Sequence, residues 1–281
     1  MEGSTKLKAA CLVGWPAGHS RSPVIHKHWL KTLGVAGDYR IEAVPPEGFA
    51  AFIGSLQARG YVGANVTIPH KERALDLAHA DARARAVGAA NTLWLEGGVL
   101  RATNTDVEGF MGNLDASAPG WDRACGAALV LGAGGAARAV LFGLLERGVE
   151  LIYLANRTRD RADAVAAQFG ARVRPVDWRE IESLLPRCHL LVNTTSLGMA
   201  GEPPLRLDLK GLPDNAVVAE LVYVPLQTEL LRAARARELR TADGLGMLMY
   251  QAVRGFTLWF GKQPEVTAKL RAVVEADLTT S

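Results

Sequence analysis

The stretch at residues 127–137 reads AALVLGAGGAA, an unbroken apolar run followed directly by a glycine-rich turn. The apolar run predicts a strand buried on both faces, as in a parallel sheet. Beyond the glycines, apolar residues from Ala137 to Leu145 recur with the spacing of an amphipathic helix. A strand, a Gly-x-Gly-x-x-Ala turn and a helix in this order are typical of a dinucleotide-binding unit.

The turn itself supplies the candidate contacts to the cofactor phosphates. Gly132 permits the tight turn, Gly134 lets the backbone approach a pyrophosphate, and Ala137 lets the helix pack closely on the strand. A glycine turn with a purely steric role is the alternative, but both flanking elements favour a cofactor site. The candidate residues in this turn are Gly132, Ala133, Gly134, Gly135 and Ala136.

The end of the next predicted strand, 151–155, indicates which dinucleotide binds. NAD-specific sites usually place an acidic residue there for the ribose 2′-hydroxyl. This chain has Asn156-Arg157-Thr158-Arg159-Asp160-Arg161 instead, and a guanidinium binds a 2′-phosphate through paired hydrogen bonds. We therefore predict NADP, bound by Arg157 and Arg161 together with Asn156 and Thr158. Thr158 is also a candidate helix N-cap, which is compatible with this role.

The pattern of apolar runs extends on both sides of this unit. The predicted strands are 8–13, 39–44, 61–66, 91–95, 99–102, 127–131, 151–155, 190–193 and 217–221. The predicted helices are 23–33, 46–59, a segment from about 69, 106–114, a segment after the glycine turn, 159–169, 228–238, 245–260 and 264–276.

Strands that alternate with helices predict an α/β protein, and 281 residues favour two domains. We expect a mainly parallel α/β substrate-binding domain at 1–113, rejoined by the C-terminal helices at 245–281. A Rossmann-type NADP-binding domain is expected at 114–244, with the active site in the cleft between the two domains.

Composition excludes several function classes. The net charge is +3 without a basic tract, so neither nucleic acid nor an anionic membrane is an expected partner. No run of about 18 apolar residues or secretory leader is present, so we expect a cytoplasmic protein. Three scattered cysteines indicate no disulfide framework. His26 and His28 face different sides of a predicted helix, and no metal site is expected.

Polar residues gather at strand boundaries in the first domain. Ser20 and Ser22 precede a helix, where Ser22 taken alone is a better N-cap than a ligand. Thr67 follows a strand and Lys71 comes one helical turn later, while Asn91 and Asp106 flank the predicted hairpin. The carboxyl ends of parallel strands are the usual ligand crevice. A surface ion pair between Lys71 and Asp106 is the alternative.

Taken in order, these segments resemble the shikimate dehydrogenase family. The blocks are HSxSP, NVTxPxK, GAxNT, NTDxxGF, GAGGAARA, NRTxxRA, VNTTSLGM and GxxMLxxQ, running from His19 to Gln251. The resemblance implies NADPH-dependent reversible reduction of 3-dehydroshikimate to shikimate, a step of aromatic amino-acid biosynthesis.

The resemblance also implies a role for each matching residue. Lys71 corresponds to the acid/base of the family and Asp106 to the aspartate paired with it. The implied substrate contacts are Ser20 and Ser22 to the carboxylate, with Tyr223 nearby, and Thr67, Asn91 and Gln251 to the ring hydroxyls. Leu221 and Gly244 are implied cofactor contacts, and Gly244 lines the nicotinamide side with 193–199. An ammonium at Lys71 suits the chemistry, because ketone reduction builds negative charge on oxygen.

Three positions depart from the pattern that the resemblance implies. Lys27 stands where an asparagine is frequent, Ala102 where a glycine is common, and Glu220 where an aspartate is usual. A quinate or dual quinate/shikimate dehydrogenase therefore remains an alternative, although Arg157 disfavours NAD. A non-catalytic metabolite-sensing module on the same scaffold is a second alternative, which would be expected to lack Lys71 or Asp106. The small-molecule substrate is the expected partner, and the protein is expected to be a monomer or a homodimer.

Overall fold

The computed structural model describes residues 7–18 and 20–279, so His19 of the first motif lies outside the described residues. The chain divides into two compact units. The first comprises the residues up to Thr105 together with those from Gln251 onward, and the second is Asp106–Tyr250. The second unit thus begins at the start of one helix and ends within another.

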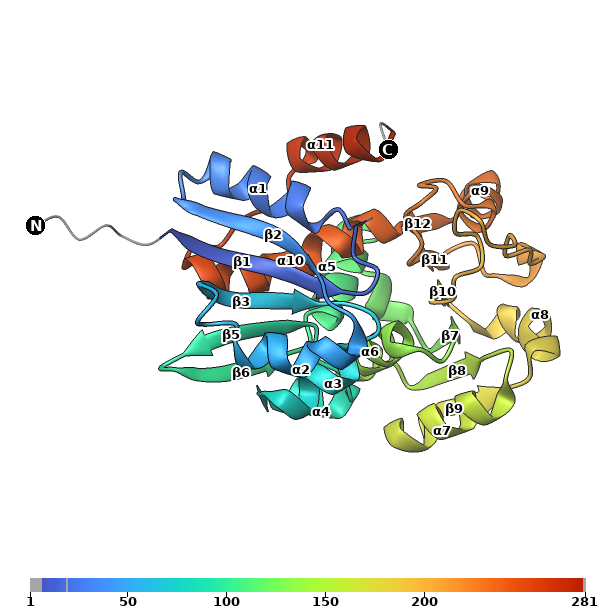
Figure 1. Cartoon of the computed structure of the whole chain (residues 1–281). Coiled ribbons are helices and arrows are strands. Elements are labelled where there is room, and N and C mark those ends of the chain that lie inside the picture. Colours follow the sequence, from blue (N-terminus) through green and yellow to red (C-terminus); the bar gives the residue numbers. More distant parts are fainter. Residues whose placement is uncertain (1–6, 19, 280–281) are drawn as a thin grey trace, which may run out of the picture. The chain divides into compact units, whose positions relative to one another are not determined.

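The first unit is built on a six-stranded sheet in the order β2-β1-β3-β5-β6-β4 (Figure 1). Its strands are β1 (Lys8–Gly14), β2 (Gly37–Ala43), β3 (Tyr61–Val66), β4 (His79–Ala80), β5 (Thr92–Glu96) and β6 (Val99–Thr103). Its helices are α1 (Ser22–Thr32), α2 (Pro46–Gly54), α3 (Lys71–Leu77), α4 (Ala82–Val87), the C-terminal part of α10 (Gly244–Phe260) and α11 (Ala268–Thr279). The β1 strand pairs in parallel with β2 and β3, whereas β5 is antiparallel to both β3 and β6.

The alternation of β1 divides the core of this unit into two layers, because successive side chains point to opposite faces of a sheet. Cys11 and Val13 pack in a cluster with Phe49 and Phe52 of α2. The opposite face carries the aromatic residues of α1 and α10, where Trp259 donates its indole N–H to the carbonyl oxygen of Leu93 at 2.8 Å. The C-terminal half of α10 is therefore tied to the centre of the first sheet.

The second unit contains six parallel strands in the order β12-β11-β10-β7-β8-β9. They are β7 (Ala127–Leu131), β8 (Leu151–Ala155), β9 (Val173–Val176), β10 (Leu190–Asn193), β11 (Val217–Glu220) and β12 (Arg240–Ala242). The helices are α5 (Asp106–Ser117), α6 (Gly135–Glu146), α7 (Arg159–Phe169), α8 (Ile181–Leu184), α9 (Glu229–Ala236) and the first part of α10. Short 3-10 turns lie at Trp121–Ala124, Trp178–Glu180, Leu185–Arg187 and Leu209–Gly211.

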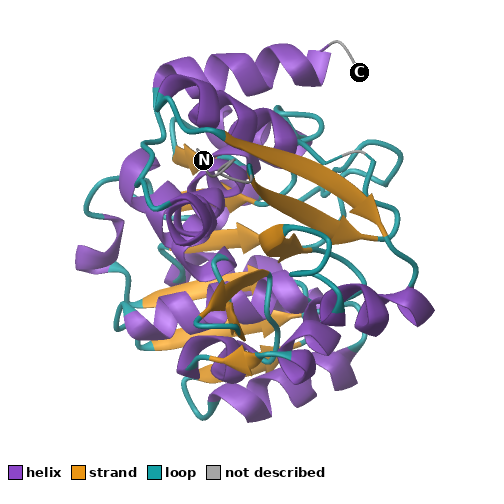
Figure 2. Cartoon of the chain, turned by 60° about the vertical axis from the view of Figure 1, so that its left-hand side comes forward, coloured by secondary structure: helices purple, strands orange, loops and turns teal. Residues whose placement is uncertain are grey.

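This strand order is that of a Rossmann fold, with the first strand after the connection at the centre and later strands added outward on both sides. The helices α5, α6 and α7 cover one face with side chains such as Phe110, Leu141 and Val165. The helices α8 and α9 cover the other with Ile181 and Leu230. Figure 2 shows helices against the strands throughout. The predicted α/β class with a Rossmann-type unit is confirmed.

The elements that the sequence did not predict are short or lie at sheet edges. The β4 strand has two residues, β9 carries Pro175, and β12 has three residues at one end of its sheet. Such segments give too few alternating positions to show a period. The last helix begins at Ala268 rather than at Pro264, after a segment without regular structure. Over the described ranges, no helix combines the length and apolar character that a membrane span needs.

Candidate active site

The substrate-side residues of the first unit meet at one edge of its sheet because of the strand directions. The β1 and β3 strands run in parallel and end at Gly14 and Val66. The antiparallel β5 begins at that edge, since Thr92 pairs with Asn65, and β6 ends there, since Thr103 pairs with Thr92. Ser20, Thr67 and Thr105 follow strands that end at this edge, and Asn91 precedes a strand that begins there. All four segments therefore lie at the same edge of the sheet.

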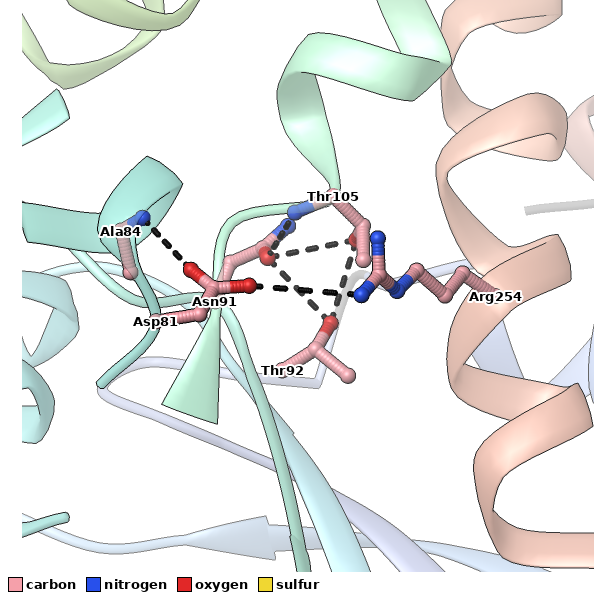
Figure 3. A network of polar contacts seen from close by, with 6 residues as sticks. All are labelled: Asp81, Ala84, Asn91, Thr92, Thr105 and Arg254. Carbon is pink, nitrogen blue, oxygen red and sulfur yellow. Dashed lines mark hydrogen bonds and ion pairs between the residues drawn. The ribbon is translucent and has the colours of Figure 1, made fainter. Parts of the chain in front are cut away.

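Asn91 is the centre of a buried hydrogen-bond network at this edge (Figure 3). Its Oδ1 accepts from the backbone N–H of Thr105 at 2.7 Å and is 3.2 Å from the hydroxyls of both Thr105 and Thr92. Asn65 donates to the hydroxyl of Thr92 at 3.1 Å and accepts from Tyr39 at 2.7 Å. Asn91, Thr92 and Thr105 are at most 3 % exposed. The network fixes the amide plane of Asn91 from the interior of the sheet.

Lys71 begins α3 directly beside this network. Its carbonyl oxygen accepts from the backbone N–H of Ala90 at 2.9 Å, so the lysine is one residue removed from Asn91. Asp106 follows Thr105 in the chain, begins α5 and is 7 % exposed. The backbone of Lys71 is thus bonded to the residue before Asn91, and Asp106 is the residue after Thr105, whose N–H donates to Asn91.

The two serines form a compact loop before α1. Ser20 Oγ accepts from the backbone N–H of Ser22 at 3.2 Å, and the two hydroxyls lie 3.2 Å apart. The expected N-cap role of Ser22 is wrong, since Arg21 occupies the cap position without a side-chain bond and Ser22 is the first helical residue. The side chain of Arg21 instead pairs with Asp277 of α11 at 3.0 Å. The serine loop is therefore held by the intervening arginine, which binds the C-terminal helix.

Gln251 is 8 % exposed and lies on α10 two turns before Trp259. One turn further along the helix, Arg254 is 4.0 Å from Asp81, which caps α4 by accepting from the N–H of Ala84 at 2.8 Å (Figure 3). Helix α10 is therefore held at two points on the first unit, which fixes the position of Gln251.

The glycine turn after β7 has the geometry that a dinucleotide needs. Gly132 has a φ of +104°, and a Cβ there would lie 2.6 Å from Thr194 Oγ1. A Cβ on Gly134 or Gly135 would meet nothing within 4 Å, so the backbone is open at this point. Gly134 occupies the N-cap position of α6 without a side-chain bond, and the helix begins with uncapped N–H groups. Ala133 and Ala136 complete the turn. These residues fit a bound pyrophosphate.

The turn after β8 also fits the predicted NADP. Asn156 shapes the turn by donating to the carbonyl oxygen of Thr158 at 2.8 Å. Thr158 occupies the N-cap position of α7 but accepts no capping bond. Arg159 pairs with acidic residues, whereas Arg157 and Arg161 are exposed and make no ion pair within the described part of the chain. Two guanidinium groups are therefore exposed after β8, where dinucleotide-binding folds usually hold the ribose of the adenosine half.

The loops after β10 and β11 lie at the carboxyl edge of the second sheet, on the opposite side of β7 from β8. A Cβ on Gly244 would lie 2.3 Å from the carbonyl oxygen of Leu221, so only glycine allows the start of α10 to approach this loop. Tyr223 follows in the same loop and is partly exposed. Thr194 is fixed beside Gly132, because its hydroxyl donates to the carbonyl oxygen of Leu131 at 2.7 Å.

Sequence reasoning assigned no role to several residues that organise the two edges. They are Arg21, Asp277, Tyr39, Asn65, Thr92 and Thr105. Their partners are far away in sequence, and no local pattern shows them. Glu220 was recognised as a departure only, and its burial was not predicted. His26 is fully buried, stacks on Tyr39 with ring centroids 4.1 Å apart, and has a pKa lowered to about 3 by burial. The part of the chain that the structure describes contains no group of three or more metal-ligating side chains.

Comparison with known proteins agrees with this geometry. Three family models match the chain, namely the shikimate dehydrogenase substrate binding domain at residues 12–93, shikimate / quinate 5-dehydrogenase at residues 121–199, and the shikimate 5′-dehydrogenase C-terminal domain at residues 244–274. The chain belongs to the shikimate dehydrogenase family.

Relatives within the family are similar over nearly their whole length. A shikimate dehydrogenase (NADP(+)) from Rhodopseudomonas palustris (strain TIE-1) is 68% identical over 271 residues, covering 96% of this chain and 97% of the relative. One from Nitrobacter winogradskyi is 67% identical over 278 residues, covering 99% of each chain. Both carry the NADP designation that the arginines after β8 predict.

Solved structures of the shikimate dehydrogenase family share the fold. The Thermus thermophilus shikimate 5-dehydrogenase in complex with NADP(H) and shikimate has a TM-score of 0.84 at 36% identity, covering 98% of this chain and 100% of that chain. The quinate dehydrogenase from Corynebacterium glutamicum in complex with NAD has a TM-score of 0.88 at 30% identity, covering 97% and 99%. The fold alone therefore does not distinguish these activities, whereas sequence identity favours the NADP-dependent shikimate enzymes.

Proposed function

We propose that this chain is an NADP-dependent shikimate dehydrogenase that interconverts 3-dehydroshikimate and shikimate in aromatic amino-acid biosynthesis. The observation that carries the proposal is the convergence of Lys71, Asn91 and the Thr105–Asp106 pair at one sheet edge, in a chain 67–68% identical to shikimate dehydrogenases (NADP(+)). A non-catalytic sensor would not need to keep an ammonium and a carboxylate on either side of an anchored amide.

The first unit binds the substrate in this proposal. Ser20 and Ser22 donate to its carboxylate, with Tyr223 as a further contact. Asn91 donates to a ring hydroxyl, because its Oδ1 is already engaged by Thr105 and Thr92. Thr67 and Gln251 bond the remaining hydroxyls. A substrate with several hydroxyls requires such a set, since each buried polar group left unmatched costs on the order of 1–3 kcal/mol.

Lys71 and Asp106 carry the proton chemistry. The ammonium of Lys71 donates a proton to the oxygen of the reacting carbonyl during reduction and accepts it back during oxidation. Asp106 orients the ammonium and accepts a hydrogen bond from a neighbouring substrate hydroxyl. When bound, NADPH supplies the hydride in reduction, and NADP⁺ accepts it in oxidation.

The second unit holds the cofactor through two groups of residues. The N–H groups at the start of α6 and the turn from Gly132 to Ala136 receive the pyrophosphate. Arg157 and Arg161 receive the 2′-phosphate, with Asn156 and Thr158 shaping the turn. Leu221 and Gly244 contact the nicotinamide side. A quinate dehydrogenase that uses NAD is the second candidate, because a quinate dehydrogenase in complex with NAD has the same fold and the fold does not separate the two activities.

Steady-state kinetics test the proposal. The purified protein should reduce NADP⁺ with shikimate, and this pair should give a higher kcat/KM than quinate with NAD⁺. We further propose that the protein acts in the cytoplasm, as expected of a biosynthetic enzyme, and as a monomer or a homodimer.

A further inference from the structure

Glu220 is a buried carboxylate at the carboxyl end of β11, only 1 % exposed. Its Oε1 accepts from Asn193 Nδ2 at 2.8 Å and from the backbone N–H of Val222 at 3.0 Å. Its Oε2 accepts from the same Asn193 Nδ2 at 3.1 Å and from the hydroxyl of Thr228 at 3.1 Å. Every one of these partners is a neutral donor, so the side chain must act as an acceptor at both oxygens.

These three donors come from separate parts of the cofactor edge. Asn193 ends β10 and begins the loop that runs to Met199, Val222 lies in the loop after β11, and Thr228 is the N-cap of α9. The carboxylate of Glu220 therefore connects the ends of two adjacent strands with the first turn of the next helix.

Asn193 also forms hydrogen bonds within the loop that follows it. Its Nδ2 also donates to the carbonyl oxygen of Leu197 at 3.1 Å, and its Oδ1 accepts from the N–H and hydroxyl of Thr195 at 3.0 and 2.7 Å. These contacts set which way the amide faces, because only the NH₂ group can donate to both Leu197 and Glu220. The backbone conformation of residues 193–197 thus depends on an acceptor at position 220.

The two loops are bonded to each other and to the glycine turn. The N–H of Ala200 donates to the carbonyl oxygen of Val224 at 2.8 Å. At its start, the first loop packs so closely that a Cβ on Gly132 would collide with Thr194. A shift of either loop would therefore change the surface on one side of the glycine turn.

Strand order identifies which half of the cofactor meets this surface. A dinucleotide crosses the carboxyl edge with its pyrophosphate at the turn after the first strand, here β7. The adenosine half then lies over β8, where Arg157 follows, and the other half lies over β10 and β11 on the opposite side of β7. The loops that Glu220 connects belong to the nicotinamide half.

We infer that Glu220 is a positioning residue that holds the loops after β10 and β11 in the conformation that binds the nicotinamide half of NADP. This inference rests on the cofactor assignment of the proposed function. It predicts a local effect, since the adenosine contacts at Arg157 and the glycine turn do not involve Glu220 or Asn193.

The change Glu220→Gln tests this role, because it keeps the size of the side chain but replaces one acceptor oxygen with a donor. That NH₂ group would face Asn193 Nδ2, Val222 N–H or the Thr228 hydroxyl, and at least one donor would lose its partner. Glu220→Asp keeps both acceptor oxygens on a chain one methylene shorter. Glu229→Gln is the matched control, since Glu229 lies on α9, is partly exposed and, among the described residues, forms an ion pair with Arg206 at the surface.

The measurement is fluorescence titration with NADPH, compared with displacement by 2′,5′-ADP, which carries the adenosine and 2′-phosphate but no nicotinamide. For Glu220→Gln we expect the NADPH dissociation constant to rise roughly tenfold, the equivalent of one lost charge-assisted hydrogen bond. The 2′,5′-ADP constant should change less than about twofold, as should both constants of Glu229→Gln. Glu220→Asp should show the same selective weakening to a smaller extent.

Equal weakening of NADPH and 2′,5′-ADP, or no weakening of either in a folded variant, would overturn the inference. If Glu220→Gln does not fold by circular dichroism, the selectivity of Glu220→Asp decides the matter by the same criterion. The titration needs no shikimate, so the two claims fail separately. An unmodified protein that binds NADPH but lacks shikimate turnover contradicts the proposed activity and leaves the test of Glu220 intact.

Discussion

The backbone N–H of Thr105 donates to the side-chain oxygen of Asn91 at 2.7 Å, across a sequence separation of fourteen residues. This bond joins the end of β6 to the residue before β5 and lies directly before Asp106. The Thr105 hydroxyl lies 3.2 Å from the same oxygen. Because this oxygen is engaged from within the protein, we expect any hydrogen bond from Asn91 to the substrate to come from its NH₂ group, with an orientation that depends on Thr105.

Thr105→Val should therefore impair catalysis without unfolding the protein. It removes the hydroxyl but keeps the backbone N–H and the shape of the side chain, so we expect kcat/KM for shikimate to fall about five- to tenfold, as for one lost hydrogen bond. Thr103→Val is a matched control two residues away. The Thr103 side chain is fully buried and its hydroxyl has no hydrogen-bond partner in the described structure. The control should keep full activity and equal or higher thermal stability, and equal losses in both variants would remove Thr105 from this role.

Lys71→Ala should lower turnover by orders of magnitude while cofactor binding persists. General acid–base catalysis contributes about 10²–10⁴-fold, and kcat should fall within or beyond that range. The NADPH dissociation constant, measured by fluorescence, should stay within about twofold, because no cofactor contact is assigned to Lys71. Lys31→Ala, on the exposed end of α1, serves as the control. Near-normal kcat in Lys71→Ala would contradict the acid/base assignment.

Arg157→Ala should change cofactor selectivity. We expect KM for NADP⁺ to rise at least about tenfold while KM for NAD⁺ changes little, because only NADP⁺ carries the 2′-phosphate. Arg187→Ala removes an exposed arginine from the 3-10 turn before β10 and should leave both values unchanged. A parallel loss for both cofactors would instead indicate a structural role for Arg157.

The ion pair between Arg21 and Asp277 predicts a small effect of the C-terminal helix on substrate binding. Asp277→Asn should raise KM for shikimate about two- to fivefold with kcat unchanged, since partly exposed ion pairs are worth up to about 1 kcal/mol. Glu275→Gln breaks a similar pair with Arg271 on the same helix, at 2.8 Å, without touching the serine loop. If both variants raise KM equally, the effect comes from α11 as a whole and not from its contact with Arg21.

Glu220 also predicts a pH dependence of stability. Burial raises the pKa of this carboxyl above its ordinary value of 4.5, and hydrogen bonds from Val222, Asn193 and Thr228 partly oppose the shift. A raised folded-state pKa means that the folded protein binds more protons than the unfolded chain, so this group's contribution to stability falls as pH rises from about 4.5 through the raised pKa. Glu220→Gln should lack that component. The difference in unfolding free energy between the two proteins, measured by urea denaturation from pH 4 to 8, should therefore shift in favour of the variant as pH rises. A difference that is independent of pH would contradict the raised pKa.

The sequence was sufficient for the parts of the molecule that local patterns encode. The run at 127–137 identified the first strand and turn of the second unit because buried parallel strands are continuously apolar and the turn requires glycine at Gly132. Arg157 could be proposed as a cofactor contact because it directly follows the strand at 151–155, where an NAD-specific site usually has an acidic residue. The family motifs then named Lys71, Asn91 and Asp106, although those assignments remain predictions until variants are measured.

The parts that the sequence did not show depend on contacts between distant segments. Thr105 and Asn91 come together only because β5 and β6 are antiparallel, and Arg21 reaches Asp277 only because α11 returns to the first unit. Glu220 looks like an ordinary charged residue at a strand end until its burial and three donors are known. The short edge strands β9 and β12 were not predicted for a similar reason. They have too few residues to show the alternation of a strand, and they are strands because they pair with β8 and β11.

The central claim is most directly tested by comparing kcat/KM for four combinations of shikimate or quinate with NADP⁺ or NAD⁺, using the unmodified protein. We predict that shikimate with NADP⁺ has the highest kcat/KM, with a loss of at least about tenfold when NAD⁺ replaces NADP⁺. A higher kcat/KM for quinate with NAD⁺, or no turnover with any pair, would contradict it.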